Sequence, residues 1–431
     1  MTAVHLQTLG CRLNEAELET WAREYRRQGV DVTQEPTEAD ILVVNTCAVT
    51  QEAVRKSRNL IRRTQRHNPQ AKLVVSGCYS ALAKPEETEA LGIDLVIGNP
   101  EKDRLVELTR QAFALPTMPQ AATEPGVNSL MARGRQRAFI KVQDGCRYRC
   151  TYCVVTLARG EERSRPIADI ISEIQALDGV HEIVLAGVHL GGYGSDLGLT
   201  LHDLISAVLQ DTDIPRIRLG SLEPWDIPPA FWTHYQNPRM MPHLHLPIQS
   251  GSDTVLRRMA RRCKTTEFAE LIKTARAQIP DINITTDIIV GFPGETDAEW
   301  KQTLDYAAQI QFGHVHIFSY SSRAGTKAAN LPNPVDKTIK SARSAQLHAL
   351  VAEHKRAMQQ RHINRDYPVL IEGQPTKTKE SEHIWQGYTP NYLRVRAQIK
   401  TTQNLDNQIH TLRTIGITAD GEALQAVIVA E

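Results

Sequence analysis

The sequence predicts an α/β protein of three parts: an N-terminal doubly wound parallel sheet, a central (βα)6-type partial barrel and a small C-terminal all-β barrel. Its 431 residues are more than one hydrophobic core usually serves, so several domains are expected. Strand and helix patterns alternate in two long stretches, which is typical of parallel βαβ units. From residue 367 onward the hydrophobic period becomes two, which indicates short β-strands.

In the first part, short apolar runs alternate with helical patterns. The expected strands are residues 4–9, 41–44, 73–76 and 95–97. The expected helices are about 14–28, 51–66, 85–91 and 102–113. We therefore expect a first domain over residues 1–114. Four turn-forming residues then fall in a polar stretch, which indicates a linker over 115–136. They are Pro116, Pro119, Pro125 and Gly126.

A second alternation gives the central part, expected over residues 137–363. The expected strands are 138–142, 183–186, 217–219, 244–248, 284–290 and 315–320. Six βα units suit a partial or complete barrel with its site at the carboxyl ends of the strands. A long helix over 337–361 follows. Short strands within 364–431, at about 369–371, 392–396, 410–417 and 426–429, predict a small Greek-key barrel.

The composition excludes several classes of protein. Hydrophobic residues make up 41% and charged residues 23%, which argues against disorder. The net charge of +1 excludes a bulk polycation, although local basic patches remain possible. Seven cysteines are too few for a disulfide scaffold, and an odd number of cysteines cannot all be paired. The first residues do not resemble a signal peptide, and no apolar stretch has the length of a membrane span, so we expect a cytoplasmic protein.

Three early cysteines each follow one of the predicted strands. Cys11, Cys47 and Cys78 come directly after the strands at 4–9, 41–44 and 73–76. A lone cysteine is more often a small buried hydrophobe than a ligand. In a parallel sheet, however, these three positions share the edge at which ligands bind. We therefore expect the three thiols to converge.

A second cysteine group, Cys146, Cys150 and Cys153, follows the first strand of the predicted barrel. Three thiolates at this spacing can reach three corners of a 4Fe–4S cube and leave one iron open to a small molecule. Structural zinc is the alternative, but zinc requires four ligands, and neither His nor a fourth Cys lies nearby. Cys263 has no cysteine neighbour in sequence and is expected to be a packing or surface thiol, not a ligand.

The segment from Cys146 to Cys153, CRYRCTYC, resembles the radical S-adenosylmethionine signature. Later segments resemble the methylthiotransferase branch of these enzymes. They are 158–160 with 163–166, 246–252 (LPIQSGS) and 286–295 (TDIIVGFPGE). The early cysteines are similar to those of that family's N-terminal domain, which carries a second cluster. The β-rich tail is similar to its TRAM module. The resemblance covers essentially the whole chain.

The segments around Cys11 (TLGCRLN) and Cys47 (NTCAVT) resemble the branch that acts on threonylcarbamoyladenosine in tRNA. The isopentenyladenosine branch of the family is the alternative assignment, but it usually has a basic residue at the position of Val49. A non-enzymatic iron–sulfur RNA-binding protein is an alternative of another class. Three positions depart from the family pattern: Thr156 and Leu157 replace a Pro-aromatic pair, and His189 replaces Asn.

The resemblance implies two 4Fe–4S clusters, held by Cys11, Cys47 and Cys78 and by Cys146, Cys150 and Cys153, with S-adenosylmethionine as the other cofactor. One S-adenosylmethionine donates a methyl group to sulfur, and another yields the 5′-deoxyadenosyl radical that removes hydrogen from C2 of the adenine. The implied partners are the tRNA anticodon loop and a one-electron donor such as flavodoxin or ferredoxin. No membrane contact is expected, and a monomer is the expected state.

Contacts to S-adenosylmethionine are expected at the ends of the barrel strands. The candidate residues are Gly187, Gly191, Glu223, Gln249, Asp287 and Arg163. The two glycines would let the backbone approach closely, although a plain turn explains them equally well. Phosphate contacts are expected from three basic runs. These runs are Arg55, Lys56, Arg58, Arg62, Arg63 and Arg66; Arg257, Arg258, Arg261, Arg262 and Lys264; and Arg133, Arg135 and Arg137. The tail from Arg365 has seven basic and eight acidic residues, so it shows no basic face by composition.

Overall fold

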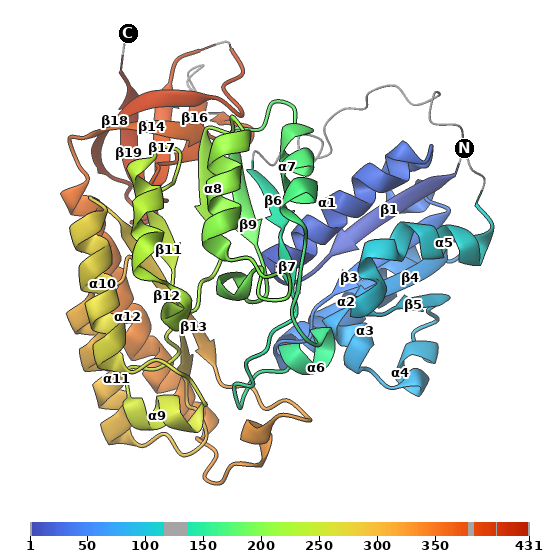
Figure 1. Cartoon of the computed structure of the whole chain (residues 1–431), viewed down its shortest axis with the longest axis horizontal. Coiled ribbons are helices and arrows are strands. Elements are labelled where there is room, and N and C mark those ends of the chain that lie inside the picture. Colours follow the sequence, from blue (N-terminus) through green and yellow to red (C-terminus); the bar gives the residue numbers. More distant parts are fainter. Residues whose placement is uncertain (1, 116–136, 378–382, 402, 430–431) are drawn as a thin grey trace.

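A computed structural model describes residues 2–115, 137–377, 383–401 and 403–429, and three units follow one another along the chain (Figure 1). The N-terminal unit is a five-stranded parallel sheet in the order β2-β1-β3-β4-β5. Its strands are β1 (Ala3–Thr8), β2 (Asp31–Thr33), β3 (Ile41–Thr46), β4 (Lys72–Gly77) and β5 (Leu95–Ile97). Its helices are α1 (Arg12–Arg27), α2 (Gln51–His67), α3 (Cys78–Leu82), α4 (Pro85–Glu89) and α5 (Leu105–Phe113).

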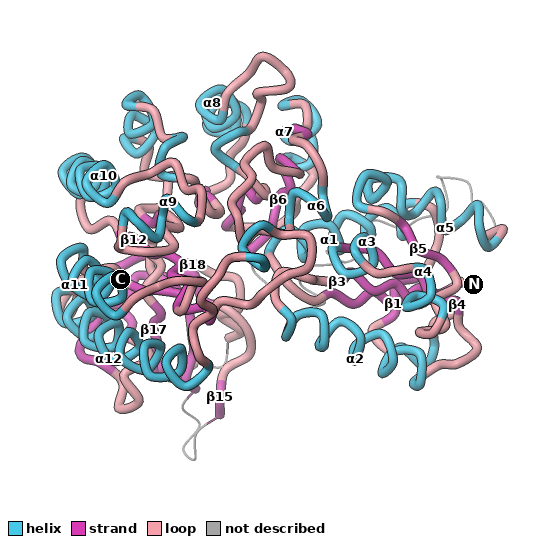
Figure 2. The backbone as a smooth tube through the Cα atoms, turned by 90° about the horizontal axis from the view of Figure 1, so that it is seen from below, coloured by secondary structure: helices cyan, strands magenta, loops and turns pink. Residues whose placement is uncertain are grey.

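Strand β3 shows why this sheet is covered on both faces. Its side chains alternate between two cores, as period-two geometry requires. Ile41 and Val43 pack with residues of α1 and α5, whereas Leu42 and Val44 pack with Ile61 of α2. Figure 2 shows α2 on one side of the sheet and α1 and α5 on the other. The strand order reverses at β1, so the carboxyl ends of β1 and β3 flank the crevice where such sheets bind ligands.

The central unit is a six-stranded partial barrel. Its strands are β6 (Arg137–Lys141), β9 (Glu182–Ala186), β10 (Arg216–Leu219), β11 (His243–His245), β12 (Asn283–Val290) and β13 (His314–Ser319). They form two parallel three-stranded sheets, which the bridges Ile217–Met240 and Ser221–His245 join. Its helices are α6 (Val155–Arg159), α7 (Ile167–Gln175), α8 (Leu201–Asp211), α9 (Asp253–Arg258), α10 (Thr265–Gln278), α11 (Asp297–Ile310) and α12 (Lys337–Arg361). A two-stranded ribbon, β7 (Gln143–Asp144) with β8 (Arg163–Ser164), lies beside the cysteine loop.

Among the described residues β6 and β13 share no hydrogen bonds, so the barrel is open between them. The N-terminal unit lies against both sides of this opening. On the β6 side, Ala16 of α1 packs against Phe139 and Val184. On the β13 side, the backbone N–H of Gln51, the first residue of α2, donates to Ser321 Oγ at 3.0 Å. The sheet with the early cysteines therefore covers the open side of the barrel.

The C-terminal unit is a closed five-stranded barrel in the order β14-β18-β19-β17-β16, closed by pairing between β14 and β16. Its strands are β14 (Asp366–Ile371), β16 (His383–Tyr388), β17 (Arg394–Ile399), β18 (Ile409–Ile417) and β19 (Leu424–Ile428), and β15 (Thr376–Lys377) extends one edge. It contacts the amino ends of the central strands. Arg218 of β10 donates to the carbonyls of Pro390 and Thr389, and Asn283 of β12 donates to that of Asn391.

The predicted fold class is confirmed, and most predicted elements form within a few residues of their expected bounds. Strands β2, β7, β8, β15 and β16 and the short helix α3 were not predicted. Strand β11 was predicted to run over 244–248 but ends at His245, because Pro247 follows and Gln249 has a φ of 78°. The predicted linker, 115–136, lies outside the described residues apart from Leu115. No helix of the described chain combines the length and apolar character needed to cross a membrane.

Candidate active site

Cys146, Cys150 and Cys153 lie in one loop at the carboxyl end of β6. Gly145 starts this loop with a φ of 73°, and a Cβ there would lie 1.9 Å from the Glu161 carbonyl oxygen, so only glycine fits. The backbone N–H of Cys153 donates to the Cys150 carbonyl at 3.0 Å, which turns the loop back on itself. Burial, with smaller contributions from the neighbouring Cys153 and Cys150, raises the pKa of Cys146 to about 12. Thiols that disfavour one another as thiolates are a donor set that iron would stabilise.

Cys11, Cys47 and Cys78 converge at the carboxyl edge of the N-terminal sheet, as predicted. A Cβ on Gly10 would lie 2.7 Å from the Cβ of Cys47, so this glycine lets the first two cysteine loops approach. Asn14 holds the same loops by donating to the carbonyls of Leu9 and Thr46 at 2.8 and 3.1 Å.

Burial, with smaller contributions from Cys11 and Cys78, raises the pKa of Cys47 to about 11, so the Cys47 thiolate is disfavoured without a metal. This second triad has the same donor chemistry as the first and fits a second cluster.

Arg159 joins the two cysteine sites. It ends α6, just after Cys153, and its side chain is 2% exposed. Its guanidinium donates to Glu17 and Asp144 at 2.9 Å each and to the Asn14 side chain at 2.7 Å. Lys102 also pairs with Glu17, at 2.6 Å. A buried ionic network therefore fixes α1, which follows Cys11, to β7 and α6, which flank the loop of Cys146, Cys150 and Cys153. Glu17 and Lys102 could not be found from the sequence, because a single charged residue in a helix or turn carries no local sign that it is buried.

Glu223 is a predicted S-adenosylmethionine contact that lies beside the radical triad. Its carboxylate forms an ion pair with Arg261 at 2.7 Å, and the same guanidinium lies 3.9 Å from Cys150 Sγ. Asp287 lies within the barrel and pairs with His245 at 3.1 Å. The backbone of Gln249 bridges to β12, accepting from Ile289 and donating to Asp287.

The other three predicted contacts have structural partners of their own. A Cβ on Gly187 would lie 3.0 Å from Gln143 Oε1, and one on Gly191 would lie 2.7 Å from the Asp226 Cβ, so protein side chains already occupy that space. The half-exposed Arg163 donates to the Arg159 carbonyl at 3.2 Å. Packing therefore explains both glycines without a ligand.

His189, the departure noted above, forms a buried network that sequence reasoning did not find. Its Nδ1 lies 2.5 Å from Glu162, and its Nε2 lies 2.6 Å from Asp226. Burial alone would lower the pKa of His189, but Asp226 and Glu162 outweigh it, so the net shift is upward. Its ring offers a ligand atom near Cys146, but both of its nitrogens are engaged by carboxylates. Zinc held by Cys146 and His189 is therefore disfavoured.

The three basic runs have different environments. Arg258 pairs with Glu299 at 2.8 Å, and Arg261 is buried against Glu223, so much of the second run is structural. Arg137 is partly buried and pairs with Glu372 at 2.8 Å, whereas Arg133 and Arg135 lie outside the described residues. The expectation of phosphate contacts is wrong for the buried Arg261, and it stays a prediction for the partly exposed Arg137 and Arg258. Cys263 lies in the barrel core, in line with its expected packing role.

A partial barrel with a three-cysteine loop at its carboxyl end, covered by a parallel sheet with three more cysteines, defines a radical S-adenosylmethionine protein with an additional metal centre. Residues 140–307 match the radical SAM superfamily, and residues 3–98 match the uncharacterized protein family UPF0004. The chain is 33% identical to a threonylcarbamoyladenosine tRNA methylthiotransferase MtaB of Thermotoga maritima, over 98% of this chain and 96% of that protein. The Bacillus subtilis MtaB is also 33% identical, over 92% and 90%.

A tRNA-2-methylthio-N(6)-dimethylallyladenosine synthase of Staphylococcus haemolyticus is 31% identical, over 89% of this chain and 77% of that protein. Among solved structures, the radical S-adenosylmethionine methyltransferase TsrM of Kitasatospora setae shares the fold, with a TM-score of 0.58 at 15% identity over 76% of this chain and 77% of that one. The chain belongs to the radical SAM methylthiotransferase family. It is an enzyme whose cofactors are S-adenosylmethionine and two 4Fe–4S clusters.

Proposed function

We propose that this enzyme adds a methylthio group to C2 of N6-threonylcarbamoyladenosine next to the anticodon of tRNA. The identity of 33% to two proteins named for this substrate, over 98% and 92% of the chain, supports the proposal. So do the segments around Cys11 and Cys47. Val49 stands where the isopentenyladenosine branch usually has a basic residue, and its side chain is 48% exposed.

The proposed reaction is supported above all by one observation: each of the two cysteine triads converges at the carboxyl end of its own parallel sheet, and Arg159 connects the two. We assign Cys146, Cys150 and Cys153 to the cluster that binds S-adenosylmethionine, and Cys11, Cys47 and Cys78 to the cluster that holds the sulfur. When bound, these groups supply the radical that activates C2 and the methylthio group that replaces its hydrogen. The protein holds the two sites in register through Arg159 and packs α1 against the β6 side of the barrel opening.

The polar residues near the radical triad are proposed to orient S-adenosylmethionine. Glu223 is the strongest candidate, because its partner Arg261 also reaches Cys150. Gln249, which follows β11, and Asp287, within the neighbouring β12, are proposed to bind an amine or a ribose hydroxyl. Gly187, Gly191 and Arg163 are weaker candidates for contact with S-adenosylmethionine, since other residues of the protein already contact them.

The remaining assignments follow from the reaction. Reductive cleavage of S-adenosylmethionine requires a one-electron donor, and we propose a flavodoxin or ferredoxin. A tRNA substrate places the enzyme in the cytoplasm. We also propose domains over 1–114, 137–363 and 364–431, since each of these segments builds a hydrophobic cluster of its own. A monomer is proposed, because one chain supplies both cysteine triads.

The test compares two RNA substrates in one assay. The anaerobic, reconstituted enzyme is given S-adenosylmethionine, a reductant and an anticodon stem-loop that carries either N6-threonylcarbamoyladenosine or N6-isopentenyladenosine. Mass spectrometry of the digested nucleosides should show methylthiolation of the first substrate only. Methylthiolation of the second alone would assign the enzyme to the alternative substrate and leave its reaction class intact. Failure on both, with S-adenosylmethionine still cleaved, would contradict the tRNA assignment.

A further inference from the structure

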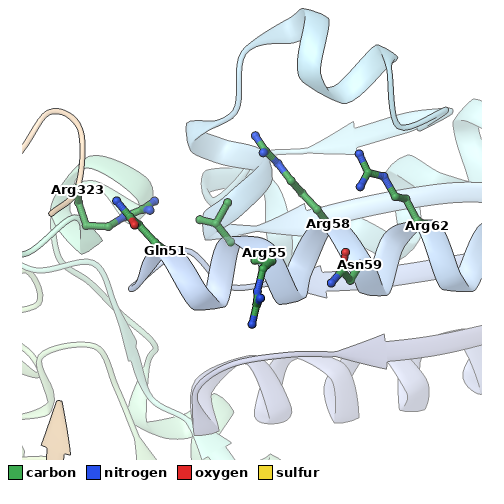
Figure 3. A pocket seen from close by; sticks show the side chains of 7 residues that line it. Gln51, Arg55, Arg58, Asn59, Arg62 and Arg323 are labelled. Atoms are coloured by element: carbon green, nitrogen blue, oxygen red, sulfur yellow. The ribbon is translucent and has the colours of Figure 1, made fainter. Parts of the chain in front are cut away.

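A pocket of about 370 Å³ lies along α2, the helix that follows the Cys47 loop (Figure 3). The residues Gln51, Arg55, Arg58 and Arg62 recur at spacings of three and four, so they share one face of the helix. Arg323, from the loop after β13, closes one end of the pocket near Gln51. The side chain of Gln51 also donates to the Ser322 carbonyl at 3.3 Å, so the N-terminal unit and the barrel both build this pocket.

Positive charge dominates the pocket, since four arginines line it and none of its lining residues is acidic. Arg58 pairs with Glu87, and Arg55 pairs with the exposed Glu52. Within the described parts of the chain, neither Arg62 nor Arg323 has a carboxylate partner. Arginine is the side chain best suited to phosphate, because its planar guanidinium can donate two parallel hydrogen bonds.

Arg323 carries a second sign of an absent ligand. Its Nε is buried and has no hydrogen-bond partner among the described residues. An unsatisfied buried donor is costly, so such a group normally has a partner when the protein is at work. Arg323 lines the pocket together with Gln51, which follows Cys47 by four residues. An anion bound to Arg323 would therefore lie at the end of α2 that follows the Cys47 loop.

The remaining basic side chains of α2 are arranged differently. Lys56, Arg63 and Arg66 belong to the same charge run in the sequence but do not line the pocket. Arg66 instead donates to the Arg62 carbonyl, one turn back on its own helix. The basic residues of α2 therefore form two sets: Arg55, Arg58 and Arg62 line the pocket, and Lys56, Arg63 and Arg66 do not. Replacing two residues of either set removes the same charge from the same helix, so each double variant is a control for the other.

We propose that the α2 pocket binds backbone phosphates of the tRNA anticodon loop beside the base to be modified. This inference rests on the proposed function. The target base must reach the N-terminal triad, and Arg323 lies at the end of α2 that follows the Cys47 loop. Arg55 and Arg62 lie seven residues apart, or about 10 Å along the helix axis, so the row can contact more than one phosphate. The contacts read no base and serve to position the loop.

The experiment measures binding of an anticodon stem-loop to the reconstituted enzyme at several salt concentrations. Each lost contact to a single-stranded phosphate should reduce the slope of log affinity against log salt by about 0.7. The double variant R55A/R62A should therefore lower affinity and flatten the slope by up to about 1.4. R323A should flatten it by about 0.7 with the iron content unchanged. The matched control R63A/R66A removes the same charge and should change the slope less than R55A/R62A does.

Equal slopes for R55A/R62A and R63A/R66A would overturn the proposal. So would a loss of S-adenosylmethionine affinity with unchanged RNA binding, because the pocket would then hold the carboxylate of that cofactor. Inorganic phosphate is included as a competitor, and RNA displacement by millimolar phosphate in the control but not in R55A/R62A would support a phosphate site. The readout is binding and does not depend on which N6 group is modified. A wrong base assignment would leave the slope difference intact.

Discussion

Arg159 and Glu17 lie 142 residues apart in the chain and form a buried ion pair of 2.9 Å between the two cysteine sites. Each is about 2% exposed, so neither charge is solvated when the other is removed. A buried pair of this kind contributes little by itself, but breaking it leaves an uncompensated charge. The pair therefore specifies the relative position of the two loops, which is what a reaction between two metal centres requires.

Removing Arg159 should damage both stability and the geometry between the centres. We expect R159A to lower the free energy of unfolding by about 3–5 kcal/mol, since Glu17 and Asp144 would remain buried with one cation fewer. Urea denaturation of the anaerobic protein measures this effect. R149A is the matched control, because the ion pair of Arg149 with Glu161 is largely exposed. A smaller effect for R159A than for R149A would refute the bracing role.

Acid should weaken the same network. Burial alone would raise the pKa of Glu17, but Arg159, Lys102 and Lys141 outweigh it and hold the pKa well below its usual value of 4.5. A carboxyl group with a depressed folded-state pKa stabilises the fold fully above its unfolded pKa. This contribution is lost as the pH falls from about 4.5 through the folded-state pKa.

The measurement is the free energy of unfolding as a function of pH for the wild type and for E17Q. The variant should be less stable than the wild type at pH 7, and its stability should fall less steeply below pH 4.5. Parallel curves for the two proteins would show that Glu17 contributes nothing to acid sensitivity.

Replacing one cysteine triad should have different effects on iron content and activity from replacing the other. C146A/C150A/C153A should lose about half of the bound iron and all cleavage of S-adenosylmethionine. C11A/C47A/C78A should lose the other half but still cleave S-adenosylmethionine, without forming a methylthio product. Iron analysis and chromatography of 5′-deoxyadenosine measure both effects. C263A is the control and should keep its iron, because Cys263 packs in the barrel core. Full iron content in either triple variant would contradict the two-cluster assignment.

The sequence allowed us to predict the cysteine triads but not the contacts between units. Each cysteine stands where a predicted strand ends, so the topology of a parallel sheet was enough to bring Cys11, Cys47 and Cys78 together. The Arg159–Glu17 pair leaves no local pattern, because its partners come from different units. The burial of Arg261 was missed for the same reason: its partner Glu223 follows another strand, and a charge run resembles a solvated face until the tertiary structure is known.

The last prediction concerns how the C-terminal barrel is attached. Arg218 is 3% exposed and donates to the carbonyls of Pro390 and Thr389 while pairing with Glu182 at 2.8 Å. R218A should therefore leave a buried carboxylate and two buried carbonyls with fewer donors, and should loosen the C-terminal barrel. Limited proteolysis should release this barrel faster from R218A than from the wild type.

The matched control for this prediction is R365A. Arg365 pairs with Asp281 across the same interface at 2.8 Å, but both side chains are nearly half exposed. Water can replace that contact, so R365A should be cleaved at close to the wild-type rate. Equal cleavage rates for R218A and R365A would show that Arg218 does not hold the barrel. A faster rate for R218A alone would establish that buried hydrogen bonds, rather than surface charge, attach the C-terminal barrel to the amino ends of the central strands.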